Sequence, residues 1–305
     1  MDPVLNSILR SWDWRPGLLL LFFTLGALYT TGWWRLRRKS HQNQLANGWR
    51  LFAYWFGLFW LVIALMSPVD ILSGQLFYMH MIQHVLLSMW AVPLILLANP
   101  FPFLLWGLPA PARDKVGNAL SRLLHREADS RSWLRAATTP GISWFIMVAI
   151  LWGWHDPNLY GAALEMEWIH DLEHLTFFAS SMLYSWHITG AGPRIHKLMS
   201  RPARIAYALA GVPASFAPGV VIAFATNVLY PHYESMPRLP APLGMSVIND
   251  QTLAGIIMWV LGSMMHFMTA FVLIARWLKH EEKRRTKYRP SAIPSPLIEI
   301  EGTTL

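Results

Sequence analysis

Two pairs of histidines occur in the sequence at a spacing of four residues. His80 and His84 lie in "HMIQH", and His170 and His174 lie in "HDLEH". Residues four apart lie on the same side of an α-helix, so each pair would point both imidazoles in one direction. This is the spacing by which one helix offers two nitrogen ligands to a metal ion. The two pairs therefore predict a metal site built from two helices.

Three further residues carry groups that can ligate a metal or orient an imidazole. His155 follows an apolar run in "WGWHDPN", and Asp250 opens another in "NDQTLAG". Glu173 directly precedes the last of the four paired histidines. A carboxylate can bind the ion itself or hold the tautomer of a ligating imidazole. Glu173 is about 100° around the helix from His174, so both a role at the site and a position away from it stay open.

The composition indicates that these residues sit in a membrane protein. Of the 305 residues, 54% are hydrophobic and only 14% are charged, against about 25% charged in a typical soluble protein. Seven apolar segments are long enough to cross a bilayer. They lie near 16–34, 49–66, 76–98, 140–155, 168–189, 205–228 and 250–276. We therefore expect an all-α, polytopic integral membrane helix bundle with seven transmembrane helices.

The basic residues predict the orientation of the bundle. With the N-terminus outside and the C-terminus cytoplasmic, all of the 25 Lys and Arg residues except Arg10, Arg15 and Arg238 fall in the inner segments, as the positive-inside rule requires. Both histidine pairs then lie at the outer ends of their helices, at matched depth. Because the basic residues occur in short clusters between apolar runs, we expect contact with the lipid bilayer and none with nucleic acid.

The sequence indicates one domain followed by a short C-terminal tail. We expect a seven-span transmembrane domain over 1–288 and a flexible C-terminal tail over 289–305, where three prolines occur without periodicity. Within the domain, residues near 112–126 would place apolar side chains on one face of a helix and basic side chains on the other. This pattern predicts a helix lying on the inner surface. The chain has no cysteine, so a thiolate metal site is excluded.

His187 and His266 fall in the inner halves of their segments. They could face each other there. Haem ligation and an interhelical hydrogen bond are both open for this pair.

Five stretches resemble one known family in their order along the chain. They are "HMIQH", "WHDPNLYGAAL", "HDLEH", "LYPHY" and "DQTLAGIIMW", and the set is similar to the multi-span cytochrome c oxidase assembly factors of the caa3-oxidase type, the CtaG family. The resemblance implies a multi-pass protein of the bacterial inner membrane that takes part in maturing haem–copper oxidases. It implies copper as the metal and the catalytic subunit of the oxidase as the partner. The functional positions carried over are His80, His84, His155, His170, His174 and Asp250.

The leading interpretation is thus a copper-binding transfer protein and not an enzyme. A membrane di-iron oxidase or hydroxylase also uses H-x-x-x-H boxes, yet it needs more histidines than the outer side offers here, commonly with adjacent pairs. A zinc peptidase would use "HDLEH", but four imidazoles on one ion would leave no open position for water. A metal-free scaffold for oxidase assembly, with a structural polar cluster, is the remaining alternative.

Overall fold

The computed structural model describes residues 3–39, 45–193, 195–237, 239–240 and 243–287. The elements in these ranges are all helices. The first half of the chain forms α1 (Pro3–Arg10), α2 (Pro16–Lys39), α3 (Gly48–Met66), α4 (Pro68–Ser73), α5 (Phe77–Val85), the π-helix η1 (Leu86–Ala91), α6 (Val92–Leu97), α7 (Pro100–Gly107), α8 (Ala110–Leu123) and α9 (Asp129–Ala137). The second half forms α10 (Pro140–Trp154), α11 (Pro157–Glu165), α12 (Glu167–Thr189), α13 (Arg201–Leu209), α14 (Gly211–Phe224), the 3₁₀ helix η2 (Pro231–Glu234) and α15 (Val247–Lys287).

Each of the seven apolar segments is helical, so the all-α class is confirmed. Five helical stretches are long and apolar enough to span a membrane: 16–39, 48–66, 77–97, 201–224 and 247–286. The bent pair α9 and α10, at 54°, would make a sixth if it forms one span. Helix α12 has 23 residues but falls short in apolar character, because histidines, serines and acidic residues occur along it. The number of seven spans and the orientation stay predictions.

The third apolar segment is not one regular helix. It begins as α5, widens into η1 and continues as α6. Pro93 explains the widening, because it has no N–H to donate and its ring clashes with the carbonyl four residues earlier. A π-helical turn relieves such a clash. The wide turn begins two residues after His84, so it lies directly beside the first histidine pair.

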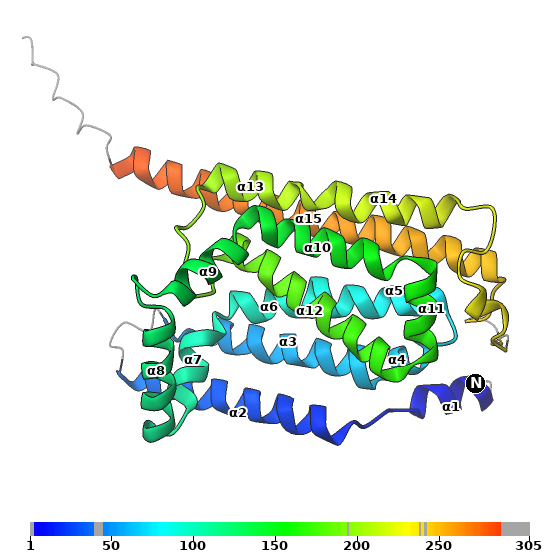
Figure 1. Ribbon diagram of the computed structural model, residues 1–305, viewed down its shortest axis with the longest axis horizontal. Helices are drawn as coiled ribbons and strands as arrows, with labels where there is room; N and C mark the ends of the chain where they lie inside the picture. Colours follow the sequence, from blue (N-terminus) through cyan, green and yellow to red (C-terminus); the bar gives the residue numbers. More distant parts are fainter. Residues whose placement is uncertain (1–2, 40–44, 194, 238, 241–242, 288–305) are drawn as a thin grey trace, which may run out of the picture.

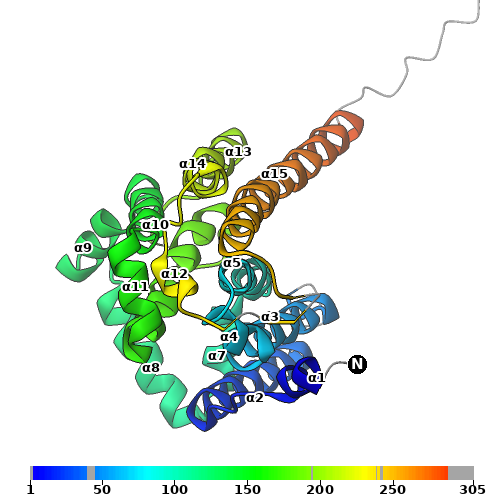
Figure 2. The ribbon, with the colours of Figure 1, turned by 90° about the vertical axis from the view of Figure 1, so that its right-hand side faces the viewer.

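The helices form an elongated bundle with different elements at its two ends. Figure 1 shows α1, α4 and α11 at one end, and α8, α9 and the last turns of α15 at the other. Seen from the first end, α5 lies near the middle of the group, between α3, α12 and α15 (Figure 2). It packs against α15 and α4. The first described helix and the end of α15 are thus at opposite ends of the bundle.

Close helix packing depends on glycines at two crossings. A Cβ added to Gly32 of α2 would clash with the carbonyl of Phe103 in α7, and one added to Gly107 would clash with the carbonyl of Leu28. The two glycines therefore let the backbones of α2 and α7 approach each other. At the other crossing, Gly255 of α15 lies against α14 in the same manner.

Helix α8 covers most of the segment predicted to lie on the inner surface, and it has no buried residue. Its helical structure is confirmed, while its position at a membrane surface stays a prediction. The predicted flexible tail, 289–305, lies outside the described residues.

Candidate metal centre

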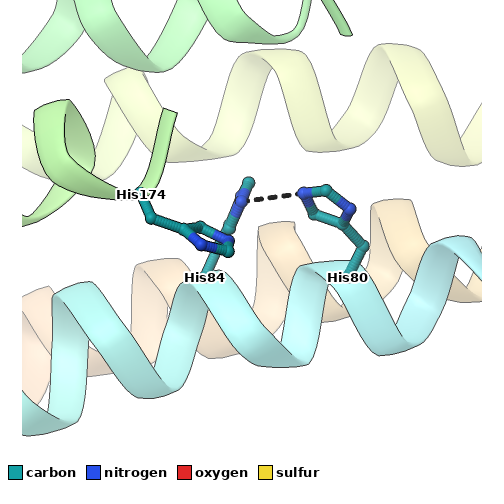
Figure 3. A group of neighbouring side chains, drawn as sticks. All are labelled: His80, His84 and His174. Atoms are coloured by element: carbon teal, nitrogen blue, oxygen red, sulfur yellow. Dashed lines mark hydrogen bonds between the residues drawn. The ribbon is translucent and has the colours of Figure 1, made fainter. Parts of the chain in front are cut away.

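The two histidine pairs converge between α5 and α12. Figure 3 shows His80 and His84 rising from α5, with His174 of α12 directed towards them. The Nε2 atoms of His80 and His84 are 2.9 Å apart. Ring centroids are 5.1 Å apart for His80 and His170 and 5.6 Å apart for His84 and His174. The structure therefore pairs the histidines by depth, as the sequence predicts.

Glu173 lies in the centre of this group. One carboxylate oxygen is 3.6 Å from Nε2 of His80, and the other is 3.5 Å from Nε2 of His84. Its side chain is fully buried. A helical wheel places Glu173 about 100° from His174, and the site includes that whole arc of α12. The sequence did not decide whether Glu173 faces the site. Its spacing of three residues from His170, which puts both side chains on one side of the helix, was the signal that could have placed it there.

Ligating atoms from this cluster gather in two overlapping sets. His80, His84 and His174 form one, and His80, His170 and Glu173 form the other; within each set the ligand atoms lie within 4.8 Å of one another. Nitrogens bound at about 2.0–2.1 Å to a tetrahedral ion are about 3.3 Å apart. Small side-chain rotations would bring either set to that spacing.

Several buried polar atoms of the cluster lack a hydrogen-bond partner among the described residues. They include Nε2 of His170 and of His174 and both oxygens of Glu173. Each such atom costs about 1–3 kcal/mol when left unpaired. Buried polar groups are otherwise nearly always satisfied. The unpaired atoms here face one another, so the donor set fits a bound cation.

His155 extends the cluster beyond His84. Its Nδ1 lies 2.6 Å from the carbonyl oxygen of Leu151, which fixes the ring and leaves Nε2 as the free ligand atom. That Nε2 is buried and has no partner in the described part of the chain. The ring centroid of His155 is 6.4 Å from that of His84. The structure thus brings His155 to the edge of the cluster.

A cavity reaches the cluster from the other end of the bundle. Its volume is about 640 Å³, and its lining includes both His84 and His155. Farther along, the lining includes Met258, Met265 and Arg276 of α15. The side of the cluster formed by His84 and His155 is therefore connected to a largely apolar space between α6, α12 and α15.

Asp250 does not join the histidines. Its two carboxylate oxygens accept hydrogen bonds from the backbone N–H groups of Phe77 and Tyr78, at 2.9 and 2.8 Å. Those N–H groups open α5 and have no partner within the helix. Asp250 therefore fixes the start of α5, one turn before His80. The sequence predicted Asp250 as a functional position of the metal site, but it did not reveal this capping contact.

A polar layer lies beside the cluster at the end of the bundle that holds α1 and α4 (Figure 1). Gln83, fully buried on α5, donates from its amide nitrogen to the carboxylate of Asp70 at 2.6 Å and to the carbonyl of Ala64 at 2.8 Å. Arg15 lies 3.6 Å from the same carboxylate and 2.7 Å from that of Asp171. Burial raises the pKa of Asp70 to about 6, although Arg15 and Gln83 oppose the rise.

Buried aromatic rings support the cluster from the side of α11. The ring of Tyr160 lies 4.9 Å from that of His80. The hydroxyl groups of Tyr160 and Tyr233 are 2.7 Å apart, and Tyr233 donates onward to the carbonyl of Ser73. This packing and hydrogen bonding restrict movement of the His80 ring.

The inner histidines belong to other contacts. Nε2 of His187 is 2.9 Å from the carbonyl of Thr138 and 3.1 Å from the hydroxyl of Ser143 in α10. His187 therefore bonds to Ser143 of α10, and no hydrogen bond joins it to His266 among the described residues. His266 bonds instead to the carbonyl of Gly262 in its own helix.

The fold and the site together define a helical membrane protein with a buried cluster of histidines around one glutamate. The chain belongs to the cytochrome c oxidase caa3 assembly factor family, whose model matches residues 27–280. This confirms the resemblance that the five sequence stretches carry.

Relatives in three mycobacteria are similar but are themselves uncharacterised proteins. Those of Mycobacterium bovis and Mycobacterium tuberculosis are each 24% identical over 287 residues, which cover 92% of this chain and 41% of the relative. That of Mycobacterium leprae is 23% identical over 262 residues, covering 85% of this chain and 38% of the relative. The chain thus spans about two fifths of the length of these relatives. No solved structure matches it.

Proposed function

We propose that this protein assists the assembly of a haem–copper cytochrome c oxidase by binding copper at the histidine cluster and passing it to the catalytic subunit. The family description supports the assembly role. The proposed copper ligands are His80, His84, His170 and His174 with Glu173, and His155 at the inner edge. Copper is here the cargo. The protein acts as a binding and transfer protein and not as an enzyme.

One observation carries the metal-binding part of this proposal. Imidazole and carboxylate groups from two helices face one another, buried and without other hydrogen-bond partners in the described residues. Buried polar groups inside a bundle are costly unless they pair or bind a ligand. The ligand atoms are nitrogen and oxygen with no thiolate available. Imidazole is a ligand that suits copper, and copper(II) binds nitrogen and oxygen sites more tightly than other divalent first-row metals.

The proposed topology puts this site at the outer side of the membrane. In it, α12 is one span, whose polar residues face the bundle, and α10 is another. The five apolar stretches bring the number to seven. The first described helix and the end of α15 lie at opposite ends of the bundle (Figure 1), as an odd number of spans requires. Copper would then enter from the outer side and pass to the catalytic subunit in the membrane.

Titration of the purified, detergent-solubilised protein with copper tests the binding site. We expect wild type to bind copper, and we expect His84→Ala and His174→Ala to lower affinity at least tenfold. His280→Ala is the matched control, because His280 is an exposed histidine of α15, and it should bind as wild type does. Equal affinity and stoichiometry in all four proteins would refute the site.

A metal-free scaffold is the second candidate, and a specific observation favours it. Several polar residues at the same end of the bundle are structural. Asp250 caps α5, and the side chain of Gln251 accepts from the N–H of Leu229 and donates to the carbonyl of Asn227. A scaffold would support oxidase assembly equally well with the His84→Ala variant, whereas a copper donor would not.

A further inference from the structure

We propose that the cluster holds two copper ions bridged by the carboxylate of Glu173. This inference rests on the metal-binding function proposed above and concerns how many ions bind and which residues divide between them. Its outer ion would be bound by His80 and His170, and its inner ion by His84 and His174 with His155. Each ion would also take one oxygen of Glu173.

The number of ligands is the first argument. Five imidazoles and one carboxylate come together in the cluster, whereas an ion bound by imidazoles typically takes about four protein ligands in a tetrahedral site. The ligand atoms do not form one compact set. They fall into two triads that share only His80. A single ion would leave part of this buried donor set unused and unpaired.

The depths of the rings then separate His80 and His170 from His84 and His174. His80 and His170 are close to each other, with ring centroids 5.1 Å apart, and His84 and His174 are close, at 5.6 Å. The crossed pair His80 and His174 is farther apart, at 6.3 Å. Each helix thus contributes one imidazole to an outer position and one to an inner position.

Glu173 has the geometry of a bridging ligand. Its oxygens do not both turn to one imidazole: Oε2 is nearer His80 and Oε1 is nearer His84, at almost equal distances of 3.6 and 3.5 Å. Neither oxygen has a hydrogen-bond partner among the described residues. Two oxygens of one carboxylate can hold metal ions about 3.5–4 Å apart, the separation found in two-metal sites.

The charge of the cluster favours the monovalent form of copper. Glu173 is the one carboxylate in the two triads, and the imidazoles are neutral as ligands. Two cuprous ions would leave a net charge of +1 in the buried site, whereas two cupric ions would leave +3. Because uncompensated buried charge is costly, the site should fill most completely under reducing conditions.

Loading the full chain with Cu(I) in detergent under anaerobic, reducing conditions tests the proposal by metal analysis per chain. We expect two ions in wild type and one in Glu173→Gln. The inner position keeps three imidazole ligands and still binds its ion, whereas the outer position keeps only two and loses its ion. His170→Ala should also retain one ion. Glu167→Gln is the matched control, because it changes an exposed glutamate of the same helix, and it should retain two.

The outcomes separate this inference from the proposed function. One ion in wild type that persists in Glu173→Gln would overturn the bridged pair and leave the single copper site intact. Two ions in both proteins would overturn the bridging role of Glu173. Loss of both ions from a Glu173→Gln variant that keeps its wild-type circular dichroism would overturn the division of ligands. No copper in wild type would overturn the proposed function itself.

Discussion

Replacing Asp250 with alanine should destabilise the protein without reducing the amount of copper bound. Asp250 is buried, with 3% of its surface exposed, and its carboxylate accepts the N–H groups of Phe77 and Tyr78. A buried donor left unpaired costs about 1–3 kcal/mol, so two donors give about 2–6 kcal/mol. At about 2–4 °C per kcal/mol, this lowers the unfolding midpoint by roughly 4–24 °C.

Thermal unfolding of the detergent-solubilised protein, followed by circular dichroism, measures this change. Asn249→Ala is the control, because Asn249 is the exposed neighbour in the first turn of α15, and its midpoint should match that of wild type. Copper per chain, measured below the midpoint, should be equal in all three proteins. An Asp250→Ala variant that loses copper while its midpoint stays within 1–2 °C of wild type would refute the reasoning and make Asp250 a ligand.

Two further predictions concern pH and packing. Burial raises the pKa of Asp70 from its ordinary value of 3.8 to about 6, so the folded protein binds a proton that the unfolded chain releases between these values. Stability should therefore fall as the pH rises from about 4 to 6, and unfolding midpoints of Asp70→Asn should lack this fall. Gly32→Ala should lower stability by about 1–3 kcal/mol through its clash with Phe103; denaturant titration should show no such loss for Gly17→Ala, which has open space around it.

The sequence predicted the two histidine-bearing helices because the residue spacing that indicates them lies within each helix. The spacing of four residues within each of α5 and α12 determines which way both imidazoles point. The matched depth also followed, since both pairs occur at the N-terminal ends of the third and fifth apolar segments, which run in the same direction through the bundle. The structure reproduces this pairing in the short distances between His80 and His170 and between His84 and His174.

Glu173 and Asp250 show what local periodicity cannot supply. Whether Glu173 faces the site depends on how wide an arc of α12 the neighbouring helices enclose, and that is a tertiary property. Asp250 sits near the cluster in depth, yet it caps α5 because the chain after α14 returns the start of α15 beside the start of α5. Neither contact can be deduced from residue spacing within one segment.

The number of membrane spans could not be settled by composition, for a related reason. Apolar content identifies helices that face lipid, but much of the length of α12 faces the interior of the bundle. Its buried residues include His174, Ser180 and His187. Such a helix can cross a membrane without being strongly apolar, so composition alone does not determine whether it does.

X-ray absorption at the copper edge of the copper-loaded protein tests the central claim most directly. Binding at the histidine cluster predicts nitrogen or oxygen neighbours at about 2.0–2.1 Å, with the outer-shell scattering of imidazole rings, and loss of that scattering in His84→Ala. Because the chain has no cysteine, sulfur neighbours could come only from methionine. A spectrum dominated by sulfur at about 2.3 Å and unchanged in His84→Ala would contradict the account.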